Sequence, residues 1–94
     1  MATIQTLHIL NKSPEHPRAA RCLEMVSEED GLLLTGGGVL FLATGHLSGP
    51  GKVFALSPDI DARGLGDFKG SNAELVDFAR MVKLSLEANR VISW

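Results

Sequence analysis

Tyrosine is absent from this 94-residue chain, and aromatic residues make up only 5% of it. The four phenylalanines and the single tryptophan are scattered through apolar stretches. Positive charge is also sparse, because 9 Lys and Arg are balanced by 11 Asp and Glu and form no cluster. Nucleic-acid binding depends on a basic surface combined with stacking rings. The composition therefore argues against direct contact with nucleic acid.

The chain has a single cysteine, Cys22, which excludes an internal disulfide and a secreted disulfide-rich scaffold. No apolar run approaches the roughly 18 residues needed to cross a bilayer. The first residues, MATIQTLH, lack the charged and apolar regions of a signal peptide. We therefore expect a cytoplasmic protein without a membrane partner.

A length of 94 residues fits one domain, spanning residues 1–94. A chain of this size buries only about 60–65% of its unfolded surface. Even so, 45% of its residues are hydrophobic. This hydrophobic fraction is high for so small a domain, and two interpretations fit it. Either some apolar surface faces a partner subunit, or the core is simply well filled.

Short apolar runs alternate with helical patterns along the chain. The runs predict strands at residues 3–10, 32–35, 52–56 and 91–94. Helical spacing predicts helices at residues 17–27, 39–43, 59–64 and 77–88. Residues 73–76 fit either a strand or a helical turn. The alternation is typical of a small three-layer α/β domain, in which helices flank a mainly parallel sheet.

Local chemistry marks where three of these helices begin. Pro17 suits the first position of a helix, and Ser57 and Asp77 suit helix caps. The last helix is also expected to bury one apolar stripe, formed by Ala79, Val82 and Leu86.

The run Gly36-Gly37-Gly38 follows a predicted strand and precedes a predicted helix, where backbone N–H groups could meet a phosphate. A dinucleotide fingerprint needs a sixth-position glycine, but Phe41 stands there. No Gly-Lys-Ser/Thr follows, so the phosphate-loop motif is also missing. We therefore interpret the run as a tight corner that needs positive φ.

The three histidines, His8, His16 and His46, show no ligand spacing with one another or with a thiol, so we expect no metal site. His8 lies in a predicted strand and is expected to be a satisfied, half-buried side chain. The other two lie in predicted loops and are expected to be solvated.

The segment around the third predicted helix carries Asp59, Asp61 and Arg63. These residues could form a polar rim at the carboxyl ends of the strands, where open α/β sheets bind ligands. The alternative is a solvated helix face with an Asp59–Arg63 pair four residues apart.

Cys22 lies near the start of the first predicted helix, with Arg18 one turn back. A helix start and a nearby cation both lower the pKa of a thiol and favour the nucleophilic thiolate. A lone cysteine among Ala19, Leu23 and Val26 also has the environment of a small buried hydrophobe. Both interpretations stay open from the residues alone.

Several ordered segments resemble the DsrH/TusB family of small sulfur-relay subunits. They are LHILNKSP (7–14), GLLLTGGGV (31–39), KVFALSPDIDARG (52–64), VDFARMVKLS (76–85) and the terminal ISW (92–94). The resemblance implies a layered α/β domain with a parallel sheet, in which residues 73–76 form a strand and Asp77 caps the next helix. It implies no cofactor.

The resemblance also implies partners. Family members work beside DsrE/TusD-like and DsrF/TusC-like subunits in a dimer of heterotrimers. Such assemblies pass persulfide sulfur to a DsrC/TusE-like protein, either toward 2-thiouridine in tRNA or within sulfur oxidation. The main acceptor cysteine belongs to the DsrE/TusD-like subunit.

Cys22 lies at nearly the position of the first-helix cysteine that DsrH members of sulfur oxidisers carry and that many TusB members lack, with a spacing from Ser13-Pro14 that is one residue shorter. Its presence favours the DsrH side of the family. The resemblance therefore makes Cys22 a candidate persulfide carrier. The chain departs from the family at Gly37, where an acidic residue is often found.

We carry forward two main hypotheses and a third, weaker one. The first is a sulfur-relay subunit, rather than a stand-alone enzyme, in which Cys22 accepts sulfur. The second is a non-catalytic structural subunit whose partners carry all the sulfur. The third is a nucleotide-binding enzyme, which rests on the glycine corner alone.

Overall fold

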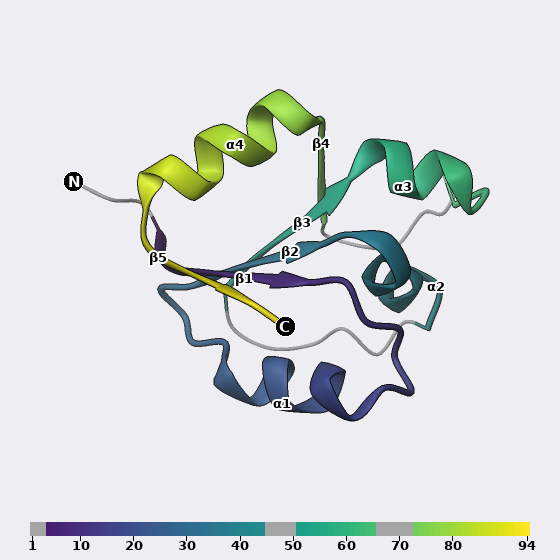
Figure 1. Cartoon of the computed structure of the whole chain (residues 1–94), viewed down its shortest axis with the longest axis horizontal. Helices are drawn as coiled ribbons and strands as arrows, with labels where there is room; N and C mark the ends of the chain where they lie inside the picture. The colour runs from purple at the N-terminus through teal and green to yellow at the C-terminus, as the bar shows by residue number, and fades with distance from the viewer. Residues whose placement is uncertain (1–3, 45–50, 66–72) are drawn as a thin grey trace.

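The elements of the chain alternate between strands and helices in the computed structural model, which describes residues 4–44, 51–65 and 73–94. Their order is β1 (Ile4–Leu10), α1 (Pro17–Met25), β2 (Gly31–Leu34), the 3-10 helix η1 (Gly36–Leu40), α2 (Phe41–Thr44), β3 (Lys52–Leu56), α3 (Ser57–Ala62), β4 (Glu74–Val76), α4 (Phe78–Glu87) and β5 (Ala88–Ser93). The predicted strand–helix alternation is confirmed (Figure 1).

The five strands form one sheet in the order β4-β3-β2-β1-β5, and every pairing is parallel. β2 lies in the middle, and all four of its residues are buried. This burial explains the unbroken apolar run Leu32-Leu33-Leu34, because a central parallel strand is covered on both faces. The predicted α/β class with a parallel sheet is correct.

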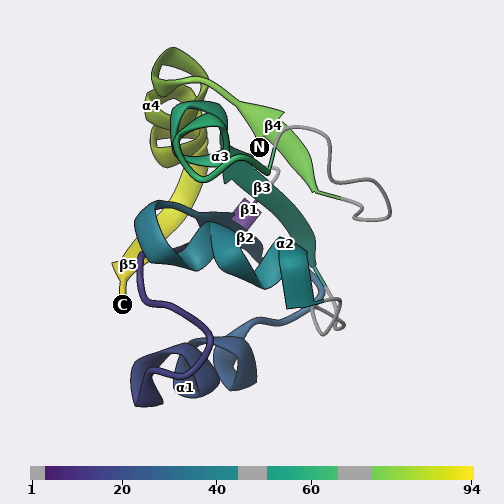
Figure 2. The same cartoon turned by 90° about the vertical axis from the view of Figure 1, so that its right-hand side faces the viewer.

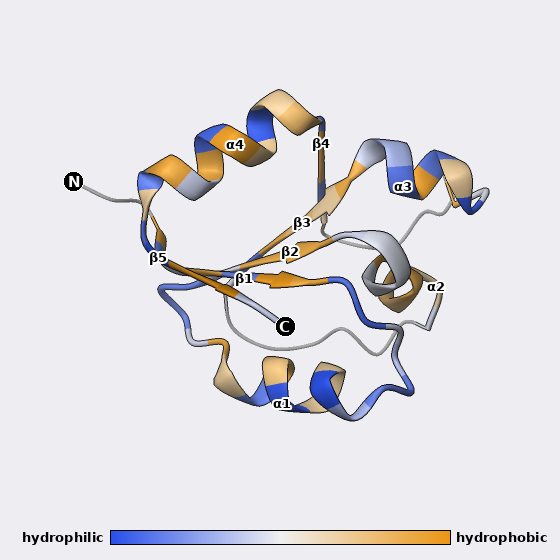
Figure 3. Ribbon diagram, in the orientation of Figure 1, coloured by the Kyte–Doolittle hydropathy of each residue, from blue (hydrophilic) through white to orange (hydrophobic). Residues whose placement is uncertain are grey.

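Helices cover both faces of the sheet, with α1 on one side and α4 on the other (Figures 1 and 2). Each face has its own apolar cluster. The cluster beneath α1 and α2 contains Leu10, Ala19, Cys22, Leu32, Leu34, Val39, Phe41, Leu42, Ala55 and Ile60. The cluster beneath α4 contains Ile4, Leu7, Leu33, Phe54, Leu56, Val76 and Leu84. Figure 3 shows the strands as the most continuous apolar segments.

Most of the local predictions agree with the structure. Pro17 is the first residue of α1, and the Asp77 side chain accepts a hydrogen bond from the Arg80 N–H at the start of α4. Residues 74–76 form the strand that the family resemblance implied. The predicted cap at Ser57 is wrong by one residue, because Leu56 is the extended residue before α3 and Ser57 already belongs to the helix.

The predicted inward face of α4 is wrong. Ala79 is exposed, Val82 is 53% exposed and Leu86 is 80% exposed. The side toward the sheet is instead occupied by Leu84, which is buried, and Met81, which is partly buried. Helical spacing identifies a stripe of residues but not the direction in which that stripe points.

The glycine corner contains two different constraints. Gly36 has a φ of 49°, as expected for a tight corner. Gly38 is close to the backbone of β1, where the Leu10 carbonyl already accepts a hydrogen bond from Thr35. A Cβ on Gly38 would overlap that carbonyl oxygen, so the position has no room for any side chain. The corner thus fixes how η1 lies against the end of β1.

We expect Gly38→Ala to lower the free energy of unfolding by about 3 kcal/mol or more, because the added methyl group meets rigid backbone. Gly64→Ala is the matched control, since Gly64 has a φ of 66° and no atom within 4 Å of its Cβ position. That control should cost only about 1 kcal/mol. Urea unfolding of both variants gives the comparison, and equal costs would contradict the close approach at Gly38.

Candidate functional site

Cys22, the predicted sulfur carrier, lies on the side of α1 that faces the sheet. It is a free cysteine with 0% of its surface exposed, and it packs in the apolar cluster beneath α1. Ala19, one turn earlier, is equally buried, whereas Arg18 is exposed. The thiol therefore belongs to the packed interior of the isolated chain.

Burial raises the pKa of the Cys22 thiol to about 11, because removal from water disfavours the thiolate. The expected lowering by Arg18 and the helix start is not found, so that expectation is corrected. With a pKa of about 11, roughly one thiol in ten thousand is ionised at pH 7. In this conformation Cys22 has the properties of a small packing residue.

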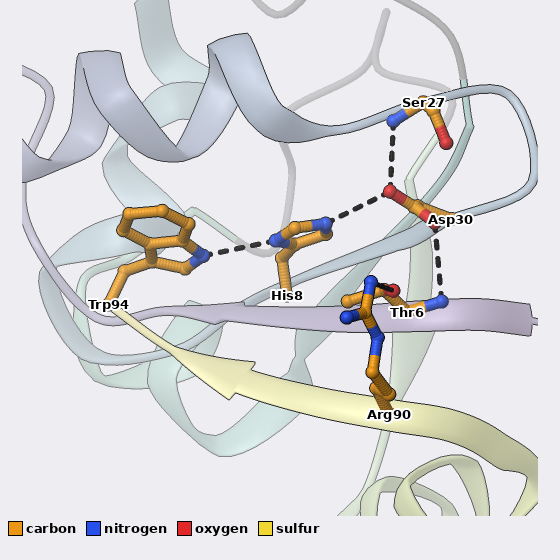
Figure 4. Close-up of polar contacts among 6 residues, drawn as sticks. All are labelled: Thr6, His8, Ser27, Asp30, Arg90 and Trp94. Atoms are coloured by element: carbon orange, nitrogen blue, oxygen red, sulfur yellow. Dashed lines mark hydrogen bonds and ion pairs between the residues drawn. The ribbon is translucent and has the colours of Figure 1, made fainter.

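The most extensive polar cluster of the described interior connects β1 to the turn before β2 and to the residue after β5. Its centre is His8, which is 2% exposed and donates from Nε2 to Asp30 Oδ2 at 3.0 Å. Trp94 Nε1 lies 3.0 Å from the other ring nitrogen, His8 Nδ1. Figure 4 shows these three side chains in a row, with Trp94 and Asp30 on opposite sides of the imidazole.

The two partners determine the tautomer of His8. An indole N–H can only donate, so His8 Nδ1 must accept. The proton of a neutral ring is then on Nε2, where the Asp30 carboxylate accepts it. A doubly protonated ring would place an N–H against the indole N–H of Trp94 and lose that hydrogen bond.

Asp30 is 7% exposed and accepts several hydrogen bonds besides that of His8. Its Oδ1 accepts from the Thr6 N–H at 3.2 Å, and its Oδ2 accepts from the Ser27 N–H at 3.0 Å. Burial alone would raise the pKa of Asp30, but the hydrogen bonds from Ser27 and His8 outweigh it and leave the pKa lowered. The ionised carboxylate thus ties β1 to the turn between α1 and β2.

Trp94 is anchored through its backbone as well as its ring. Its N–H donates to the Ile9 carbonyl at 2.9 Å, and its carbonyl accepts from Lys12 Nζ at 3.0 Å. The indole and imidazole rings lie edge to edge, with 24° between their planes and 6.1 Å between ring centroids. We call Thr6, His8, Ser27, Asp30 and Trp94 together the polar clasp.

The polar groups of the clasp are satisfied by hydrogen bonds to one another. Both ring nitrogens of His8 have hydrogen-bond partners within the clasp, Asp30 at Nε2 and Trp94 at Nδ1. Among the described residues, no buried side-chain nitrogen or oxygen lacks a hydrogen-bond partner. The same residues contain no group of three His, Cys, Asp or Glu side chains that could hold a metal ion.

The remaining predicted site residues do not assemble into a site. Asp59 Oδ2 accepts from the Gly36 N–H at 2.8 Å, so it braces the glycine corner. No ion pair joins Asp59 to Arg63, although both lie in the part of the chain that the structure describes. His16 caps α1 by accepting from the Arg18 N–H, rather than being merely solvated. The prediction for His46 lies outside the described residues.

The sequence reasoning missed the pairing of His8 with Asp30. His8 was expected to be satisfied but only half-buried, and no local signal singled out Asp30. The parallel register places Leu7 beside Gly31, so Asp30 lies just before β2 and next to Thr6. That register depends on the sheet pairing, which no local pattern reports.

Within residues 4–44, 51–65 and 73–94, no helix has the length and apolar content to span a bilayer.

Comparison with known proteins gives consistent results. The family model described as "DsrH like protein" matches residues 12–91. A protein named TusB from Enterobacter sp. (strain 638) is 36% identical over 94 residues, which cover 94% of this chain and 99% of the relative. TusB proteins from Pectobacterium parmentieri and Escherichia coli (strain K12) are 31% and 33% identical, with the same coverage.

We expect Asp30→Asn to lower the free energy of unfolding by about 1–3 kcal/mol at pH 7, because buried donors lose their carboxylate acceptor. The folded-state pKa of Asp30 is below its ordinary value of 3.8. Its contribution is therefore complete above that value and is lost as the pH falls through the lowered pKa. The gap between wild type and variant should be largest near neutral pH and shrink below about pH 4.

Urea unfolding at several pH values measures this gap. Asp61→Asn, at an exposed position of α3, is the control and should leave stability unchanged. A constant gap at every pH would contradict the ionised state of Asp30.

We expect Cys22 in the folded chain to react with a thiol reagent at pH 7.5 at least about 100-fold more slowly than in urea, because the reaction needs both local opening and ionisation. Absorbance of the released thiolate follows the reaction. Equal rates in the folded and unfolded chain would show an accessible thiol and contradict the burial of Cys22.

Proposed function

This chain belongs to the DsrH family, and on that premise we propose that it is one subunit of a cytoplasmic sulfur-relay assembly. The observation that carries the proposal is the extent of the match, which leaves almost no part of the chain for another activity. The proposed partners are the related DsrE/TusD-like and DsrF/TusC-like subunits, arranged as a dimer of heterotrimers. A DsrC/TusE-like protein takes the sulfur onward.

We place the assembly in tRNA 2-thiouridine formation rather than in sulfur oxidation. The similar proteins described above all bear the name TusB, and the TusB side of the family is the one linked to tRNA. The sparse positive charge of this chain suits a subunit that passes sulfur through other proteins rather than one that holds the tRNA itself.

Within that assembly, the proposed role of this chain is structural. A persulfide carrier needs a thiolate that a donor can reach. Cys22 is 0% exposed, and burial raises its pKa to about 11. These two properties favour a subunit that positions its partners while their cysteines carry the sulfur.

The competing candidate keeps Cys22 as a carrier, and its support is the position of Cys22 on α1, as in DsrH members. In that reaction the Cys22 thiolate attacks the outer sulfur of a partner's persulfide. A new S–S bond forms on Cys22, and the partner's cysteine leaves as a thiolate. The reaction requires α1 to move so that the thiol leaves the apolar cluster and reaches a donor.

We expect Cys22→Ala to restore normal 2-thiouridine in cells that lack the native chain, because the thiol is not needed for a structural role. Mass spectrometry of digested tRNA measures the modified nucleoside, with empty-vector cells as the negative control. Thermal unfolding of the purified variant shows whether the smaller side chain has preserved the fold.

The outcomes separate the two candidates. Loss of 2-thiouridine with a folded, assembled Cys22→Ala subunit would establish Cys22 as a carrier and overturn the structural role. Normal 2-thiouridine in cells without any copy of this chain would overturn the tRNA assignment itself.

A further inference from the structure

An apolar stripe runs along the outer side of α4. Phe78 is 56% exposed, Val82 is 53% exposed and Leu86 is 80% exposed. The three residues are spaced four apart, so they form one row along the helix, and exposed Ala79 extends it. We call this row the α4 stripe.

α4 has apolar residues on two sides, because Leu84 and Met81 pack toward its own sheet while a second apolar row is exposed. Its charged residues Arg80 and Glu87 are partly exposed, and Arg80 Nε lies 4.0 Å from Glu74 Oε2. Phe78, Val82 and Leu86 are exposed to solvent. A surface helix normally places its apolar stripe against the core. The exposed row of α4 is therefore suited to contact with the surface of another protein.

The size of the α4 stripe suits the centre of a protein interface. Three large side chains with these exposed fractions present on the order of 300–400 Å² of apolar surface. One side of a standard interface buries roughly 800 Å², with an apolar centre and a polar rim. The stripe would supply about half of that area, and its flanking polar residues would supply the rim.

We propose that the α4 stripe is the docking surface for the apolar face of a helix in a related relay subunit. This inference rests on the proposed function, because it places that subunit on a specific face of the chain. A row of residues spaced four apart forms a ridge that packs into the groove of another helix. The row contains no charge, so the facing surface of the partner is apolar as well.

The charge beside the stripe distinguishes a related subunit from a second copy of this chain. Lys83 is exposed next to Val82 and makes no ion pair or hydrogen bond with the described residues. In an antiparallel pairing of two copies about Val82, the two-fold axis would bring both Lys83 side chains to the same rim, where they repel. A different subunit with an acidic residue at that rim removes this repulsion.

Val82→Glu tests the inference. Glutamate forms helices at least as well as valine, so α4 should persist while its stripe acquires a charge. Met25→Glu is the matched control, because Met25 is a 59% exposed apolar residue on α1, across the sheet from α4. Circular dichroism and thermal unfolding verify that both variants are folded.

The binding measurement uses the purified DsrE/TusD-like and DsrF/TusC-like subunits of the same organism as probes, with calorimetry for affinity and native mass spectrometry for composition. We expect Val82→Glu to weaken the affinity by about tenfold or more, since a charge would enter an apolar interface. Met25→Glu should stay within about twofold of the wild type, a difference near the limit of such measurements.

Each further outcome has a definite consequence. Wild-type affinity in Val82→Glu would overturn the docking surface while leaving the proposed function intact. Failure of the wild-type chain to bind either probe would instead overturn the proposed function. A wild-type dimer that Val82→Glu converts to a monomer, with unchanged affinity for both probes, would identify a second copy as the occupant and overturn the inference.

Discussion

The Asp30 carboxylate is the interaction on which the arrangement of this chain depends. It accepts hydrogen bonds from His8 on β1, from the Thr6 backbone and from the Ser27 backbone after α1. His8 in turn accepts from the indole of Trp94, at the end of β5. One charged group in the interior therefore sets the relative positions of β1, β5 and the turn that leads into β2. Because these donors are buried, loss of the carboxylate would leave them without a hydrogen-bond acceptor and would lower the stability of the fold.

The two faces of the sheet differ in how their residues are used. The face beneath α1 contains the polar clasp, whereas the helix on the other face, α4, leaves an apolar stripe exposed. Beneath α1, Cys22 is part of the apolar packing and His8 is part of the polar clasp. On the opposite side, α4 contributes only buried Leu84 and partly buried Met81 to the sheet and leaves its apolar stripe in solvent. Such a division is what a subunit needs when its function lies in its contacts. The apolar surplus of the sequence is accounted for in part by this exposed surface.

Local sequence signals were sufficient for the order of the elements and for several of their ends. Pro17 and Asp77 begin α1 and α4 because their effects on φ and on backbone N–H groups act within one turn. The direction of the α4 stripe could not be predicted, because spacing is the same whether a stripe faces the core or a partner. The pairing of His8 with Asp30 depends on the register of β1 and β2, and the raised pKa of Cys22 depends on packing around α1. These properties arise only when distant segments meet.

The junction between α4 and β5 has a mechanical consequence. Glu87 ends the helix and Ala88 begins the strand, so no loop separates them. The pairing of β5 with β1 therefore also fixes where the C-terminal end of α4 lies over the sheet. That strand ends beside Trp94, whose ring contacts His8. One continuous stretch of backbone thus connects the exposed side of α4 to the hydrogen bond between Trp94 and His8.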